Sequence, residues 1–220
     1  MKCTPPSRST HSSPRHGPSA TQQASSFLEA SLPTPLPWSR HVSDRVLYHP
    51  SVTAPVRHLP DVPFPAYAYV PGAAPHPTRD PKGHSYQTEP EDAVEVCPPD
   101  KWGSCAPYLF GVDLYNAGYL WEAHEAWESL WHVSKHDLPQ AQFIQGLIQC
   151  TAATLKVRME QPVGVEKLGT QGTERMETTA LAVAPHYMGL NIPSFIGDFR
   201  KFVAGSPTSA ETRPMIILED

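Results

Sequence analysis

The stretch DLPQAQFIQGLIQCTAATLKVRM, residues 137–159, is the part of the sequence that decides the fold. Asp137 followed three residues later by Gln140 predicts the start of a helix. On a helical projection, the apolar side chains cover more than half of the circumference: Phe143, Ile144, Leu147, Ile148, Cys150, Leu155 and Met159. A helix that is apolar nearly all round belongs at the centre of a bundle, so this stretch predicts a buried central helix.

Two helices are predicted before this stretch. The first starts with Ser104 as its cap and ends at Gly118. The second follows at once over residues 119–132, and so short a turn predicts an antiparallel hairpin.

Two more helices are predicted after it. Residues 163–184 follow Pro162 and form a helix despite three glycines, each of which lowers helix propensity by roughly 1 kcal/mol. A short amphipathic helix then runs from the cap Asn191 to the terminator Gly205. Because no alternating strand pattern is present, the fold class is all-α, a compact bundle of about five helices with a central buried helix.

The flanks differ from this helical region in composition. Residues 1–100 hold 19 of the 26 prolines, and residues 1–60 carry six Lys/Arg against two Asp/Glu. Dense proline prevents long helices and central strands. We therefore expect a disordered basic Pro/Ser-rich tail (1–60), an extended Pro/His-rich arm docked on the body (61–103), the helical domain (104–205) and a loose C-terminal tail (206–220).

Composition also bears on location and partners. No apolar signal region follows the N-terminus and no stretch is long enough for a membrane span, which predicts a cytoplasmic protein without a membrane partner. Four cysteines without C-x-x-C spacing indicate neither a disulfide framework nor a zinc knuckle. The cations of the tail are scattered singly, so nucleic acid is not the expected partner. A homodimer and a protein partner are the two alternatives that stay open.

The motif GYLWEAHEAWESLW, residues 118–131, carries the residues best suited to chemistry. His124 and Glu128 lie one turn apart at the edge of the apolar arc, whereas Glu122 and Glu125 project onto the opposite, wetter side. An imidazole and a carboxylate on one face can hold a divalent metal or share a proton as a catalytic couple, with Glu125 as a third candidate. They can equally hydrogen-bond the helix to its neighbour, and both readings stay open.

Further metal ligands would have to come from the arm, where the candidates are His76, Asp80 and His84. A second feature is the polar strip of the central helix. This strip predicts either a groove or an exposed face, and the groove-lining candidates are Gln142, Gln145, Gln149 and Trp131.

The sequence FGVDLYNAGYLWEAHEAWESLW, followed by FIQGLIQCTAATLKV, resembles the bacterial family called domain of unknown function 309. The shared pattern is N-x-G-x-Y/F, A-H-E-x-x-E-x-x-W and a Q-G-L-I-Q helix, over roughly residues 105–205. The arm resembles the preface of longer family members. One departure is the glycine-broken fourth helix, where the resemblance leads us to expect a basic or histidine residue near Leu168. The resemblance implies a compact helical fold and strengthens the interpretation that His124 and Glu128 are functional residues.

Two hypotheses follow. In the first, the protein is a small helical binding or scaffold module in which the His/Glu/Trp motif joins the hairpin to the central helix. In the alternative, it is a metal-dependent, hydrolase-like enzyme with a site between hairpin and arm.

Overall fold

The computed structural model describes residues 56–88 and 94–219. This part of the chain is mostly helical, which confirms the predicted all-α class. Its helices are α2 (Ala106–Asn116), α3 (Leu120–Val133), α4 (Leu138–Arg158), α5 (Pro162–Ala182) and α6 (Ile192–Ala204), with 3-10 turns η1 (Pro99–Ser104) and η2 (Ala210–Thr212). The predicted disordered tail lies outside the described residues except for residues 56–60.

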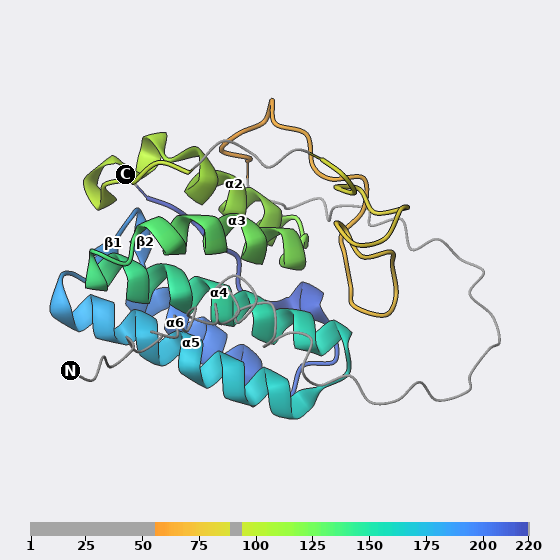
Figure 1. The fold of residues 1–220 in the computed structure, drawn as a ribbon. Coiled ribbons are helices and arrows are strands. Elements are labelled where there is room, and N and C mark those ends of the chain that lie inside the picture. Colours follow the sequence, from red (N-terminus) through yellow and green to blue (C-terminus); the bar gives the residue numbers. More distant parts are fainter. Residues whose placement is uncertain (1–55, 89–93, 220) are drawn as a thin grey trace, which may run out of the picture. The chain divides into compact units, whose positions relative to one another are not determined.

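The central position predicted for residues 137–159 is confirmed. Helix α4 packs against α3 on one side and α5 on the other (Figure 1). Asp137 caps it, because its Oδ1 accepts a hydrogen bond from the backbone N–H of Gln140 at 3.1 Å. The side chain of Gln140 does not complete a capping box and instead donates to the carbonyl of Cys97 at 2.6 Å.

The glycines of α5 are points of close helix approach. A Cβ atom at Gly172 would lie 2.8 Å from Cys150 Sγ, and one at Gly146 would lie 2.9 Å from the carbonyl of Gly172. Both distances are too short for a real side chain, so α4 and α5 can approach this closely only because both positions are glycine. The packing of α5 against α4 offsets its low intrinsic helix propensity.

The hairpin of α2 and α3 turns at Gly118, as predicted. Gly118 has a φ of +84°, the left-handed conformation that favours glycine. The N–H of Tyr119 donates to the carbonyl of Leu114 at 2.8 Å and that of Gly118 to Tyr115 at 3.0 Å, which is a Schellman ending. The predicted cap at Ser104 is wrong: Cys105 occupies the N-cap of α2, and the Ser104 hydroxyl donates to Lys101 within η1.

The absence of a side chain at Gly111 lets α2 pack closely against α3. A Cβ at Gly111 would lie 2.1 Å from Trp127 Nε1, so the indole fills the space that any other residue would occupy. The same Nε1 donates to the carbonyl of Tyr108 at 3.1 Å. Trp127 is fully buried, and it therefore packs the hairpin.

The prediction of a loose C-terminal tail is wrong for residues 206–219. Arg213 is buried and donates from Nη2 to the carbonyls of Tyr115 at 2.6 Å and Asn116 at 2.8 Å, the last carbonyls of α2. The Asn116 side chain pairs in turn with the backbone of Ile216 at 2.8 and 2.9 Å. These contacts join residues about 100 positions apart, which helical periodicity does not reveal.

Two smaller features also escaped the sequence pattern. Strands β1 (His186–Tyr187) and β2 (Leu190–Asn191) form an antiparallel hairpin, and two-residue strands are too short to show alternation. Cys97 and Cys105 form a disulfide, which the spacing of the cysteines did not indicate. The intervening η1 turn brings them together without a recognisable cysteine motif.

Within the described residues, no helix combines the length and hydropathy needed to cross a membrane.

Candidate functional site

Glu122 of α3 holds the arm. Its Oε1 accepts a hydrogen bond from the backbone N–H of Tyr69 at 2.9 Å and lies 3.2 Å from Nε2 of His84. Burial raises the pKa of Glu122, while these two partners act to lower it. The prediction that Glu122 faces water is wrong, because the arm covers this face and leaves the residue 7% exposed.

A second buried carboxylate holds the chain that precedes the arm. Asp113 of α2 accepts hydrogen bonds from the backbone N–H groups of His58 at 2.8 Å and Leu59 at 2.9 Å. Nε of Arg57 lies 3.6 Å from Asp113 Oδ2. Residues 57–59, which the sequence assigned to the disordered tail, are thus bound to the helical body.

Trp121 lies between the arm and the motif histidine. Its ring meets Tyr69 edge-on at 5.0 Å between centroids and His76 at 5.7 Å, both from the arm. On α3 itself, the His124 ring stacks on Trp121 at 6.1 Å. The aromatic contacts fix the position of the His124 ring relative to the docked arm.

The motif residues form a compact group of ligand atoms. His124 Nδ1 lies 3.3 Å from Oε1 of Glu125 and 3.9 Å from Oε2 of Glu128. One ligand atom from each of the three residues lies within 4.8 Å of the others. All three residues belong to one helix, α3, where they occupy positions i, i+1 and i+4.

Two of the three residues are withdrawn from water. His124 is 3% exposed and Glu128 4%, whereas the Glu125 side chain is 46% exposed. Nδ1 of His124 and Oε1 of Glu128 are buried without a hydrogen-bond partner in the described part of the chain. Buried polar atoms are normally satisfied, and these two belong to a group of seven in the described residues that are not.

The charge of Glu128 is disfavoured by its surroundings. Burial raises the pKa of its carboxyl, His124 and Lys135 act to lower it, and Glu125 acts to raise it. One turn later, burial and Lys135 lower the pKa of His132, whose Nε2 lies 3.8 Å from Glu128 Oε1. His132 lies within α3 and is half-buried.

The arm candidates have other partners. His84 pairs with Glu122, the His76 ring lies against Tyr69 and Trp121, and Asp80 accepts a hydrogen bond from the N–H of Lys82 at 2.8 Å. The group of three ligand residues on α3 includes none of them. The arm therefore braces the helix that carries the site, and the structure does not bring His76, Asp80 or His84 into the cluster.

The glutamine strip is an interhelical contact. Arg175 of α5 donates to Oε1 of Gln149 at 3.0 Å and to Oε1 of Gln142 at 2.8 Å. Gln145 between them is half-buried. Trp131 is half-buried as well, and its ring lies under Lys135 Nζ at 4.2 Å.

Residues 108–168 match the family described as Domain of unknown function (DUF309). This segment is similar to that family, as its motifs indicated. It runs from α2 into α5 and contains His124, Glu125 and Glu128, while the arm and residues after 168 lie outside the match. Leu168, near which a basic or histidine residue was expected, is buried. Comparisons with curated proteins and with solved structures returned no match.

Sequence reasoning missed Asp113 and Glu122 as the residues that hold the N-terminal segment. Each is an acidic residue on a helix face that the arm covers, and the helical projection could not place the arm. For Asp113 the sequence held a signal, because this residue lies within the otherwise apolar run FGVDLY. A carboxylate that is buried with such a run needs a hydrogen-bonding or charged partner.

Proposed function

We propose that this protein is a helical binding module that holds a divalent cation at His124, Glu125 and Glu128. The observation that carries the proposal is Nδ1 of His124. It is buried, has no hydrogen bond, and lies between carboxylate oxygens at 3.3 and 3.9 Å. A cation placed among these atoms would satisfy all three residues at once.

The donor set defines the class of cation. One imidazole nitrogen and two carboxylates suit first-row divalent ions such as Zn²⁺, Mn²⁺ and Fe²⁺, with remaining coordination positions left for water or a further ligand. The exposed Glu125 side chain provides the side of access. Because burial raises the pKa of Glu128, protonation of this carboxyl would compete with cation binding.

The rival reading is a structural role for His124. A histidine that joins two helices does so through hydrogen bonds from its ring. The buried Nδ1 of His124 makes none, although two carboxylates of its own helix lie close by. The observed geometry therefore favours a ligand role over a structural one.

The functional unit in this proposal includes the arm. We retain the division into an arm (61–103) and a helical domain (104–205), and we propose that the two act together. Glu122 binds the arm two residues before His124, and Trp121 contacts both the arm and the His124 ring. The docked arm would hold α3 in the orientation that the cation requires.

Metal binding to the full chain tests this proposal. The protein is stripped with a chelator, dialysed, and titrated with Mn²⁺ and Zn²⁺ by calorimetry, with metal content measured by elemental mass spectrometry. We expect near-stoichiometric binding that is lost in His124→Ala and Glu125→Gln. Glu125→Gln changes an exposed side chain and should leave the fold intact, as circular dichroism would verify.

The matched control is His136→Ala, which removes an exposed histidine outside α3. It should bind metal as the wild type does. Absence of binding to the wild-type chain, or full retention of binding in Glu125→Gln and His124→Ala, would show that the cluster is not a cation site and would favour the structural role.

A further inference from the structure

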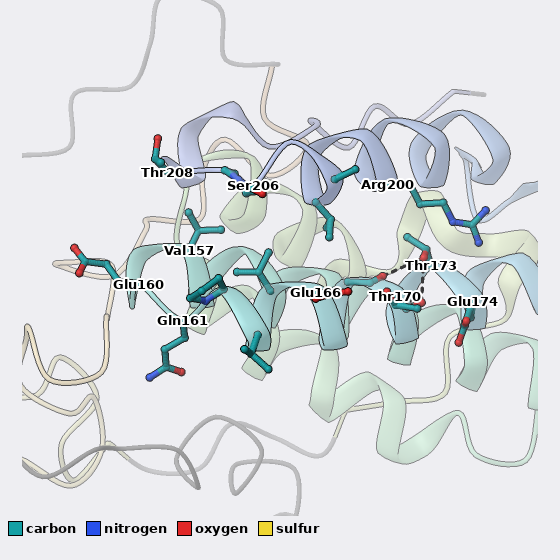
Figure 2. Close-up of a pocket in the computed structure, with 17 residues that line it drawn as sticks. Val157, Glu160, Gln161, Glu166, Thr170, Thr173, Glu174, Arg200, Ser206 and Thr208 are labelled. Carbon is teal, nitrogen blue, oxygen red and sulfur yellow. Dashed lines mark hydrogen bonds between the residues drawn. The ribbon is translucent and has the colours of Figure 1, made fainter.

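A cavity of about 990 Å³ lies between α5 and α6 (Figure 2), and its lining includes none of the residues of the α3 cluster. It is lined by the end of α4, by α5 from Pro162 to Glu174, by the last turns of α6 and by residues 206–208. Its volume is at the upper end of the range for small-molecule sites. No sequence pattern indicated this cavity, and the proposed cation site does not use it.

The walls of the cavity are aliphatic. Its apolar lining consists of Val157, Pro162, Val163, Val165, Gly169, Val203, Ala204 and Pro207, and no aromatic residue lines it. Val163 is 78% exposed, which is unusual for a valine on a packed helix. At Gly169, a Cβ would lie 2.7 Å from Cγ2 of Val203, so the glycine lets α6 approach α5 along the cavity. Such walls suit an aliphatic chain rather than a planar ring.

The charges around the cavity are mostly negative. Glu160, Glu166 and Glu174 line it, and Figure 2 shows Glu160 and Glu174 near opposite ends. Arg200 is the cation of the lining; it is bound to Glu177 at 2.7 Å, and its charge also interacts with that of Glu174. Among the salt bridges of the described residues, none involves the three lining glutamates. The cavity therefore attracts cations.

The acidic side chains are also spaced along the cavity. Glu166, Thr170 and Glu174 follow one another at intervals of four residues, which places them on one face of α5. Glu166 and Glu174 are thus about 12 Å apart along the helix axis. Carboxylates at this spacing beside an aliphatic wall match ammonium groups that are separated by methylene chains.

We propose that this cavity binds a linear aliphatic polyamine. Its methylene segments would lie against Val163, Val165 and Val203, and its ammonium groups would donate charge-assisted hydrogen bonds to Glu166 and Glu174. The lack of an aromatic cage argues for primary and secondary ammonium groups rather than a quaternary one.

Calorimetric titration of the full chain with spermidine tests the inference, at physiological ionic strength to suppress weak surface association. We expect saturable binding that weakens about tenfold or more in the double variant Glu166→Gln/Glu174→Gln. Both side chains are exposed, so the fold should be unaffected. Thr170→Trp, which fills the cavity from an exposed position, should also abolish binding.

The matched control is Glu95→Gln/Asp100→Asn, which removes the same charge from exposed positions outside the cavity. Spermidine should bind this variant, and also Glu128→Gln, as tightly as the wild type. No saturable binding, or an equal loss in the control pair, would overturn the proposal. So would tighter binding of oligolysine with the same dependence on Glu166 and Glu174, since it would identify a basic peptide as the occupant.

Discussion

Tyr69 and Glu122 lie 53 positions apart in the sequence and are joined by a buried hydrogen bond of 2.9 Å, from the backbone N–H of Tyr69 to Oε1 of Glu122. A hydrogen bond to a charged acceptor contributes about 1.5–3 kcal/mol, and more is lost when a buried partner is left unsatisfied. Phe64 adds a stacked contact with Tyr119 at 5.0 Å. The arm is therefore part of the folded unit.

Glu122→Ala should release the arm. The variant removes the acceptor for Tyr69 and the partner of His84, so cleavage by trypsin after the exposed Lys82 should accelerate roughly tenfold or more. Mass spectrometry of the fragments identifies this cut. Glu125→Ala is the control, because Glu125 takes part in neither of these two contacts with the arm. It should leave the rate of cleavage after Lys82 unchanged. Equal rates in wild type and Glu122→Ala would show that this contact does not hold the arm.

Gly111→Ala should destabilise the hairpin. The new methyl group would meet the Trp127 indole at 2.1 Å, and overpacking of this kind costs about 1–3 kcal/mol in the free energy of unfolding. Urea denaturation measures the change. In a Trp127→Leu background the same substitution should cost much less, because the smaller side chain leaves room. An additive penalty in the double variant would contradict this explanation.

Arg213→Met should also lower stability. The substitution leaves the carbonyls of Tyr115 and Asn116 without their donor, at a cost of about 2–3 kcal/mol. Arg200→Met is the matched control, since Arg200 forms an exposed ion pair with Glu177 that is worth about 0–1 kcal/mol. Thermal and urea unfolding of both variants provide the comparison. A small effect at Arg213 would mean that residues 213–219 contribute little to the fold.

The stability of the metal-free protein should depend on pH through Glu128. Burial raises the pKa of Glu128 above its ordinary value of 4.5, so the folded state disfavours the charged carboxylate. The stabilising effect of the protonated form is present below this value and is lost as the pH rises through the folded pKa. Glu128→Gln has no titratable carboxyl at this position, so it should not show this loss of stability.

The stability of Glu128→Gln relative to wild type should therefore increase as the pH rises above 4.5, the ordinary pKa of the carboxyl, as measured by urea unfolding in the presence of a chelator. The same variant should lose divalent-cation affinity by more than the roughly 10–100-fold that an outer-shell change costs. A stability difference that does not change with pH would show that Glu128 does not titrate differently in the folded and unfolded states.

Much of the helical architecture followed from local patterns. The apolar surface of residues 143–157, the cap at Asp137 and the left-handed Gly118 each act within a few residues, and the structure has them where the pattern predicted. The i, i+4 relation of His124 and Glu128 is likewise a property of any helix at this position. Helix periodicity, caps and turn glycines are local, so the sequence by itself determined the helices and the composition of the motif.

Tertiary structure decided which faces are buried and which polar atoms find partners. The arm converts Glu122 from a surface residue into a buried anchor, and the C-terminal segment covers the end of α2 through Arg213. The glycines of α5, unfavourable for an isolated helix, become contact points once α4 and α6 are present. These outcomes depend on contacts between residues distant in sequence, and their free energy comes from burial and hydrogen bonding that a helical projection does not contain.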